Sequence, residues 1–114
     1  MFKKCTVKNS DGAKVFNLEI ADTFLKRFLG LMGRKKITAG QGLLILPCNS
    51  IHMLFMRFSI DAVYIDENYK VKKIVRNLTP FIGISICAGA RAVIELRAGE
   101  ADRLNFKIGS KVNF

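Results

Sequence analysis

Apolar and polar positions alternate along the first part of the chain, and this pattern predicts a β-hairpin. Between residues 16 and 20 every second side chain is apolar, which is the period of a strand with one buried face. Residues 9–12 read Asn-Ser-Asp-Gly, and Asn, Asp and Gly tolerate the left-handed backbone of a tight turn. We therefore expect strands over residues 2–8 and 13–20, joined by this turn.

The period then changes to that of a helix. In residues 22–33 apolar side chains recur at spacings of three and four positions, which places them on one helical face. Asp22 is a suitable N-cap, and Gly33 followed by the cations of residues 34–36 is typical of a helix end. The pattern predicts one early helix near residues 22–33.

The remainder of the chain is rich in short strand-like segments. Turn residues at 66–68 and 88–90 separate some of them, and no repeat, linker or biased segment interrupts the chain. The fold class that we expect is mostly β (α+β), a single domain over residues 1–114 with a compact, antiparallel β-barrel-like sheet. The expected strands cover residues 43–46, 51–56, 60–65, 70–76, 81–87, 91–97 and 104–108.

Composition favours a reduced, cytoplasmic protein. The three cysteines, at positions 5, 48 and 87, are odd in number and widely spaced, which argues against a disulfide framework. The first residues lack the pattern of a secretory signal. No stretch reaches the roughly 18 uninterrupted apolar residues of a membrane span, so we expect none.

The chain carries 19 basic and 9 acidic side chains, a formal net charge of +10. Such a charge attracts polyanions, among them nucleic acid, anionic lipid and acidic proteins. The basic residues are dispersed, however, which favours a solvated basic surface over a nucleic-acid site. We expect weak, salt-sensitive binding to nucleic acid that disappears by roughly 0.2 M salt.

Cys48, His52 and Met56 raise the possibility of a metal or a nucleophilic site. A blue-copper site needs two histidines, and this chain has one. On a strand, three side chains at these spacings would also be spread over too long a row to meet one ion. A cysteine nucleophile needs its base within about 3 Å, which spacing alone does not show. We expect no metal.

Two carboxylates lie in apolar, strand-like runs. Asp61 and Glu95 must either find partners or be protonated if they are buried. We favour a buried ion pair with Arg27, Arg57 or Arg97 over an open polar cleft. Glycoside hydrolysis would depend on the separation of the two carboxyl groups. The glycines form no phosphate-binding or dinucleotide motif, and we expect no cofactor.

Three segments together resemble the domain-of-unknown-function 192 family of bacteria and archaea. They are "TFLKRFLGLMGR" at 23–34, "IHMLFMRFSIDAVYID" at 51–66 and "AVIELRAGEADRLNFKIGSKV" at 92–112. The resemblance implies a small β-rich domain and no established activity. Many relatives have an aromatic residue followed by Met-Lys-Asn where this chain has Ile51-His52-Met53, so the resemblance assigns no shared role to His52.

The function that we predict is a non-catalytic module that binds an unknown small molecule or protein partner. Its polar side chains would anchor a ligand through charge-assisted hydrogen bonds. The alternatives are a sequence-independent nucleic-acid binder and an enzyme of unrecognised type. The predicted ligand-binding residues are Arg27, Arg34, His52, Arg57, Asp61 and Glu95.

Overall fold

The computed structural model describes residues 2–21, 37–53, 56–80 and 83–114, with His52 described by its backbone alone. Strands dominate these residues, so the prediction of a mostly β fold is confirmed. The strands are β1 (Phe2–Asn9), β2 (Gly12–Ala21), β3 (Gln41–Ile45), β4 (Ser50–His52), β5 (Ile60–Ile65), β6 (Val71–Leu78), β7 (Ile84–Ile86), β8 (Ala92–Arg97) and β9 (Lys111–Asn113), and the helix is α2 (Glu100–Arg103).

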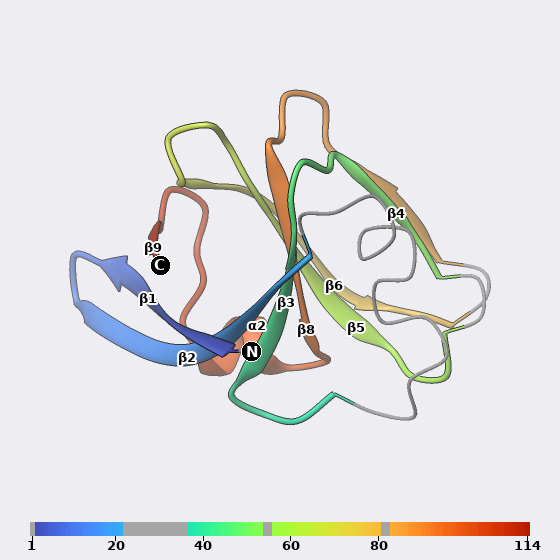
Figure 1. Ribbon diagram of the computed structural model, residues 1–114, viewed down its shortest axis with the longest axis horizontal. Coiled ribbons are helices and arrows are strands. Elements are labelled where there is room, and N and C mark those ends of the chain that lie inside the picture. Colours follow the sequence, from blue (N-terminus) through green and yellow to red (C-terminus); the bar gives the residue numbers. More distant parts are fainter. Residues whose placement is uncertain (1, 22–36, 54–55, 81–82) are drawn as a thin grey trace.

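Seven of the strands form one curled sheet in the order β6-β5-β8-β3-β2-β1-β9, and β4 and β7 form a separate two-stranded ribbon (Figure 1). The expected hairpin is present, because β1 and β2 pair directly around the turn between them. The pairs of this sheet that the structure describes are antiparallel, as expected, except that β2 and β3 are parallel. A parallel pair of strands needs a long crossover connection, and the chain between β2 and β3 includes residues 22–36. These residues are not described, so the helix predicted near residues 22–33 lies outside the described residues.

The two edges of the sheet meet at one end of the molecule. The Val71 amide donates a hydrogen bond to the Ser110 carbonyl over 2.9 Å, and the Val112 amide donates to the Tyr69 carbonyl over 2.9 Å. Lys70 and Lys111 form a bridge between these two contacts. We call this junction of residues 69–71 with residues 109–112 the seam. It turns the curled sheet into a partly closed barrel and places β9 between β1 and the start of β6.

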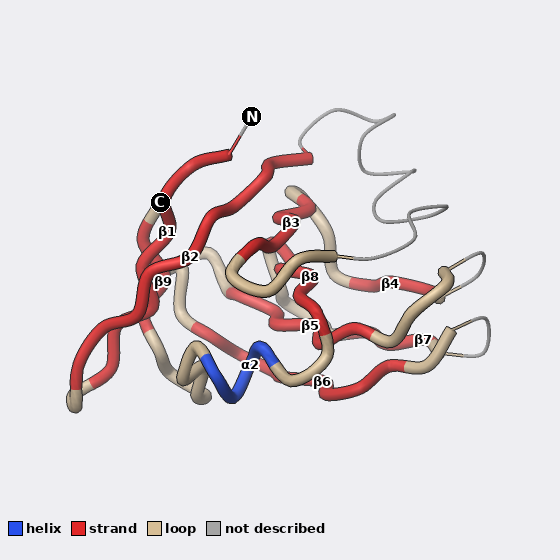
Figure 2. Tube along the Cα trace, turned by 90° about the horizontal axis from the view of Figure 1, so that it is seen from below, coloured by secondary structure: helices blue, strands red, loops and turns tan. Residues whose placement is uncertain are grey.

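Two apolar cores lie on opposite faces of the sheet. The first core lies on the face toward α2 and contains the Phe16 and Phe106 rings, which meet edge to face with centroids 5.8 Å apart. The second core lies between the sheet and the β4–β7 ribbon, and it contains Met53 and Tyr64. Strand β5 is buried at every position because its alternate side chains enter both cores. Figure 2 shows the ribbon and α2 at different parts of the sheet.

The strand expected at residues 104–108 is wrong. Residues 100–103 form α2 instead, and the last strand begins only at Lys111. The alternation of Leu104, Phe106 and Ile108 suggests a strand, but Asn105 has a φ of 61° that turns the backbone out of an extended path. Leu104 and Phe106 are still buried, whereas Ile108 is 67% exposed. Among the described residues, no helix is long and apolar enough to cross a membrane.

Gly42 marks a close approach in the middle of β3. A β-carbon built at this position would lie 2.8 Å from Leu96 Cδ2 and 3.2 Å from Phe16 Cε2, both in the first core. A glycine inside a strand often marks such tight packing. The side chains around it fill the space that any larger residue would need.

We expect Gly42→Ala to lower the free energy of unfolding by about 1–3 kcal/mol, because the added methyl group overpacks a filled core. Urea unfolding midpoints measure this loss. Combining Gly42→Ala with Leu96→Val forms a double-mutant cycle, in which the smaller neighbour should recover part of the loss. A Gly42→Ala loss below about 0.5 kcal/mol would show that the core yields freely there.

Candidate functional site

Asp61 is held by backbone amides. Ile60 pairs with Leu78 and Ala62 with Val75, so two residues of β6 oppose Asp61 in a β-bulge. One of them, Asn77, has a φ of 56°, and its amide donates to Asp61 Oδ1 over 2.9 Å. The side chain of Asp61 is 1% exposed. The bulge thus directs an amide out of the strand ladder and onto the carboxylate.

The other oxygen of Asp61 lies at the start of α2. Oδ2 accepts hydrogen bonds from the amides of Gly99 and Ala101, each over 3.0 Å. The first amides of a helix have no partner inside the helix, and here the carboxylate from β5 supplies one. For Asp61, the expected ion pair with an arginine is not what the described residues show, because its partners among them are three backbone amides.

Glu100 fixes the same helix from its other side. Glu100 Oε1 accepts from the Gly40 amide over 2.5 Å and from Arg103 Nη2 over 2.8 Å. The hydrogen bond from Arg103 is the largest reason why the pKa of Glu100 lies below its usual value. Asp61 and Glu100 together hold the short helix against β5 and the β3 turn.

Glu95 leaves the sheet on the opposite face from Asp61. Residues directly opposite each other in an antiparallel pair share a face, and Glu95 is paired with Ala62 whereas Asp61 is paired with Leu96. Ala62 belongs to the second core and Leu96 to the first. The two carboxyl groups therefore do not face a common cleft, and they do not form the acid pair of a glycosidase.

The other predicted site residues are distributed as follows. Arg57 is exposed and lies between the ribbon and β5. The backbone of His52 ends β4 and pairs with Ile84 of β7. Arg27 and Arg34 lie outside the described residues. The structure does not bring Asp61 and Glu95 together, and a shared role for the six stays a prediction.

A polar pair is buried in the second core. Tyr64 Oη and Ser85 Oγ are 2.6 Å apart and share a hydrogen bond, and burial is the main reason why the pKa of Tyr64 is raised. Burial likewise raises the pKa of the Cys5 thiol to about 12, which makes it a poor nucleophile. Among the described residues, no three His, Cys, Asp or Glu side chains gather as a metal site would require.

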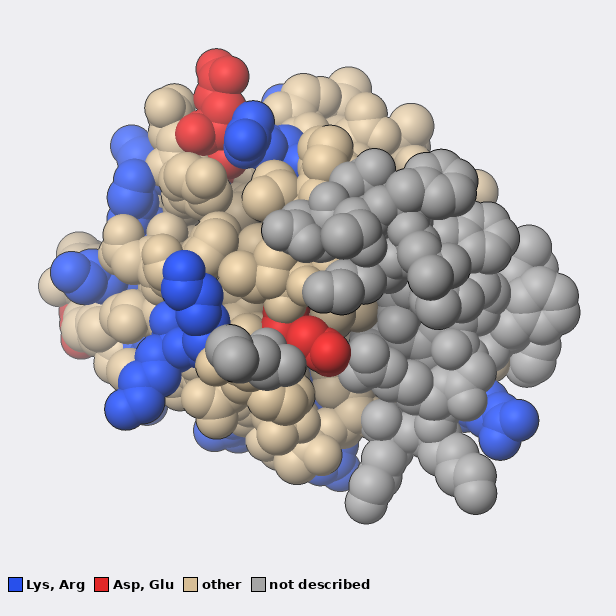
Figure 3. All heavy atoms as spheres, viewed as in Figure 1, with Lys and Arg blue, Asp and Glu red and all other residues tan. Residues whose placement is uncertain are grey.

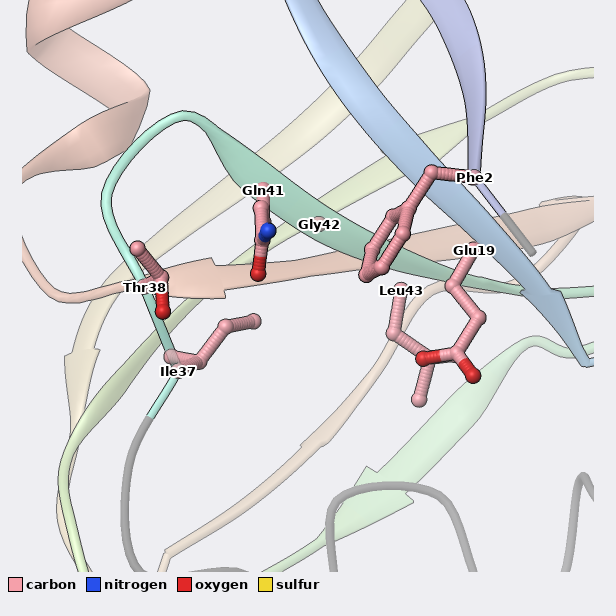
Figure 4. Close-up of a pocket in the computed structure, with 7 residues that line it drawn as sticks. All are labelled: Phe2, Glu19, Ile37, Thr38, Gln41, Gly42 and Leu43. Carbon is pink, nitrogen blue, oxygen red and sulfur yellow. The ribbon is translucent and has the colours of Figure 1, made fainter.

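One small hollow opens beside β3 (Figure 4). Its volume is about 60 Å³, enough for a few water molecules and well below the roughly 300 Å³ of a typical ligand pocket. Figure 4 shows the Gln41 side chain and the Phe2 ring on the two sides of Gly42. The hollow is lined by Phe2, Glu19, Ile37, Thr38, Gln41, Gly42 and Leu43.

A larger, open groove lies beside the seam, between the β1–β2 turn and the turn that precedes β9. Its volume is about 390 Å³, which falls within the range of small-ligand sites. We call it the lysine groove, because lysines recur along its wall. It is lined by Lys8, Asn9, Ser10, Lys107, Ile108, Gly109, Ser110 and Lys111.

Hydrogen bonds between the two turns build the floor of the lysine groove. Asn9 Nδ2 donates to the Asn105 carbonyl over 2.7 Å. Ser110 Oγ donates to Asn9 Oδ1 and accepts from the Lys107 amide over 2.8 Å. The two contacts of Asn9 join residues 96 and 101 positions apart, so the groove exists only in the folded chain.

Lysines face one another across the seam. Lys8 of β1 lies directly opposite Lys111 of β9, and Lys111 lies opposite Lys70 in the bridge. Like charges at directly opposite positions destabilise a sheet. Asp11 Oδ2 is 3.4 Å from Lys107 Nζ, and Asp66 Oδ1 accepts from the Lys70 backbone amide over 3.0 Å. The side chains of Asp11 and Lys107 are both more than half exposed, so this pair compensates little.

The surface view agrees with this distribution of charge. Figure 3 shows many of the blue side chains on the side of the molecule that carries β1 and β2. The sequence did not predict the groove, because its lysines, at positions 8, 107 and 111, are dispersed along the chain. A weak signal was available, however: Lys8 directly precedes the predicted Asn-Ser-Asp-Gly turn.

Comparison with known proteins finds relatives along nearly the whole chain. The family model DUF192, described as Uncharacterized ACR, COG1430, matches residues 6–114. A UPF0127 protein of Thermococcus sibiricus is 36% identical over 102 residues, which cover 85% of this chain and 65% of that protein's length. A UPF0127 protein of Pyrococcus horikoshii is 36% identical over 100 residues, covering 85% of this chain and 86% of the relative.

A similar fold is present in a crystal structure. A protein of unknown function from Novosphingobium aromaticivorans, solved at 1.22 Å resolution, superposes with a TM-score of 0.90 and 28% sequence identity. The match covers 99% of this chain and 85% of that one. The two chains therefore share the same overall fold.

We expect Asp61→Asn to lower the free energy of unfolding by about 2–4 kcal/mol, because an amide offers one acceptor atom where three buried amides need partners. The exposed Asp102, which pairs with Arg76 over 3.0 Å, supplies the matched control. Asp102→Asn should cost less than about 1 kcal/mol. Equal losses in the two variants, measured by urea unfolding, would contradict the structural role of Asp61.

Proposed function

The chain belongs to the DUF192 family of uncharacterised proteins, and from its geometry we propose that it is a non-catalytic module that binds an anionic ligand in the lysine groove. The proposal rests on one observation, the row of lysines across the seam. Lys8, Lys111 and Lys70 occupy directly opposed positions on three neighbouring segments. An anion bound between them would offset their mutual repulsion.

The chemistry of the groove supports anion binding. Neighbouring strands lie about 4.8 Å apart, so the three lysines form a row roughly 10 Å long whose flexible side chains can converge on one multiply charged group. Each ammonium group would donate charge-assisted hydrogen bonds, which are stronger than neutral ones. Phosphate-type groups suit this row because they carry several charged oxygens close together.

The lining of the groove supports binding rather than catalysis. The described residues that line it are lysine, asparagine, serine, isoleucine and glycine, and none of these described residues is a carboxylate, histidine or cysteine. Its Ser110 hydroxyl is already engaged with Asn9 and the Lys107 amide, so it lacks the adjacent base that activates a serine nucleophile. The proposal therefore assigns no reaction to the site.

The six residues predicted from the sequence are not part of this proposal. Asp61 accepts hydrogen bonds from Asn77, Gly99 and Ala101, and these contacts are structural. The nucleic-acid alternative is also less well supported. No aromatic side chain is among the described residues that line the groove, and single-stranded nucleic acids are bound largely by stacking on such rings.

We expect tripolyphosphate to bind the protein in 50 mM salt, and we expect Lys8→Ala with Lys111→Ala to weaken this binding at least about tenfold, since each lysine contributes about 1 kcal/mol or more. Isothermal titration calorimetry measures the affinity. The control is Lys4→Ala, four residues earlier on β1 and outside the groove. It should leave the affinity within about twofold, because the exchange removes only a distant charge.

A thermal melt of Lys8→Ala tests whether this variant is folded. We expect an unchanged or slightly higher Tm, because the variant removes like-charge repulsion across the seam. Absence of tripolyphosphate binding would overturn the proposal. An equal loss of affinity in Lys4→Ala would overturn it as well, because binding would then follow overall charge and not the groove.

A further inference from the structure

The lysine groove carries an exposed aliphatic side chain at its rim. Ile108 lies in the turn between Lys107 and Lys111 and is 67% exposed. The turn is closed by the Ser110 amide, which donates to the Lys107 carbonyl over 2.9 Å. An isoleucine held at the tip of a turn and flanked by lysines presents an apolar group and positive charge on the same surface.

The turn is held firmly and its backbone is largely satisfied. The Gly109 amide donates to the Val71 carbonyl over 2.8 Å, and the Val71 amide donates to the Ser110 carbonyl over 2.9 Å. The Lys107 amide donates to Ser110 Oγ. The amides of Lys107, Gly109 and Ser110 therefore have hydrogen-bond partners already. Moving the turn out of water would not leave these donors unpaired.

We propose that the lysine groove docks the protein on the surface of an anionic lipid bilayer, with the lysines at the headgroup phosphates and Ile108 in the acyl boundary below them. This inference rests on the proposed function, because it identifies the bound anion as a lipid headgroup. Basic side chains and an aliphatic group on one surface match the two layers of a membrane interface.

Nucleic acid fits the same surface less well. Bases are bound by stacking on aromatic rings, and the aromatic pair near the seam, Tyr69 and Phe114, meets edge to face at 5.4 Å and packs against the first core. An exposed isoleucine contributes little binding free energy next to a phosphate backbone. Its transfer from water into the acyl region of a bilayer is favourable, and a dissolved phosphate offers no such apolar region.

The charge balance indicates weak and reversible docking. Two acids lie close to the lysines of the groove and the seam: Asp11 pairs with Lys107, and Asp66 accepts from the Lys70 backbone amide. Lys111 Nζ also donates to the Asn68 carbonyl, and this turn carries the exposed Glu67. A few lysines with one aliphatic side chain give a marginal, salt-sensitive membrane affinity.

Co-sedimentation with lipid vesicles tests the inference in 50 mM salt. One vesicle preparation is pure phosphatidylcholine, and the other contains 30% phosphatidylserine. We expect binding to the anionic vesicles alone, and we expect Ile108→Ser to weaken it by about tenfold, the order of an aliphatic side chain's transfer out of water. Lys8→Ala should weaken it about fivefold.

The matched control is Ile84→Ser on the β4–β7 ribbon. Ile84 is 75% exposed and lies outside the groove, so this variant should bind anionic vesicles like the unaltered protein. A loss of vesicle binding in Ile108→Ser alone would separate insertion of Ile108 from the general effect of removing an exposed isoleucine.

The two proposals fail in different ways. If tripolyphosphate binds in the groove while the anionic vesicles do not, the bilayer inference is overturned and anion binding stands. If neither binds, both are overturned. Equal losses of vesicle binding in Ile108→Ser and Ile84→Ser would overturn the bilayer inference, and so would submicromolar single-stranded DNA binding in 150 mM salt that displaces the protein from vesicles.

Discussion

The carboxylate of Asp61 on β5 binds backbone amides of two other segments, at points where the strand ladder is interrupted. Through its two oxygens it fixes the bulge of β6 at Asn77 and the start of α2 at Gly99 and Ala101. Charged acceptors make stronger hydrogen bonds than neutral ones, and a buried carboxylate requires such partners. The partners are supplied by backbone that the rest of the fold leaves unpaired, so the acid and the amides satisfy one another.

The position of the lysine groove follows from this interaction. After α2, the Phe106 amide donates to the Ala101 carbonyl over 2.8 Å, and Leu104 and Phe106 enter the first core. The chain then reaches the turn at residues 107–110, which forms one wall of the groove and leads into β9. The start of α2 therefore sets where the last strand meets β1 and the seam.

Much of the fold could be predicted from local patterns. The hairpin of β1 and β2 follows from its alternation and its turn residues, and β5 and β8 were expected within a residue of their observed bounds. The pattern failed after residue 100, because Leu104 and Phe106 alternate like strand residues although their chain turns. Local alternation reports which side chains are buried, and it does not report the backbone path that buries them.

The candidate site was less predictable. The burial of Asp61 was anticipated correctly from its apolar neighbours, but its partners are amides freed by a bulge and a helix start, which no side-chain pattern reveals. The lysine groove depends on pairing between β1, β9 and residue 70. Cations that are remote in sequence become neighbours only when the sheet closes. The sequence therefore gives their number but not their arrangement in space.

The central claim is that closure of the sheet creates an anion site at the lysine groove. The most direct measurement is a two-dimensional amide NMR titration of the isotopically labelled protein with tripolyphosphate. The account predicts that the largest shifts fall on residues 8–10, 69–71 and 107–111, the two turns and the seam. Shifts centred on the small hollow around Gln41, or spread evenly over lysines of the whole surface, would contradict it.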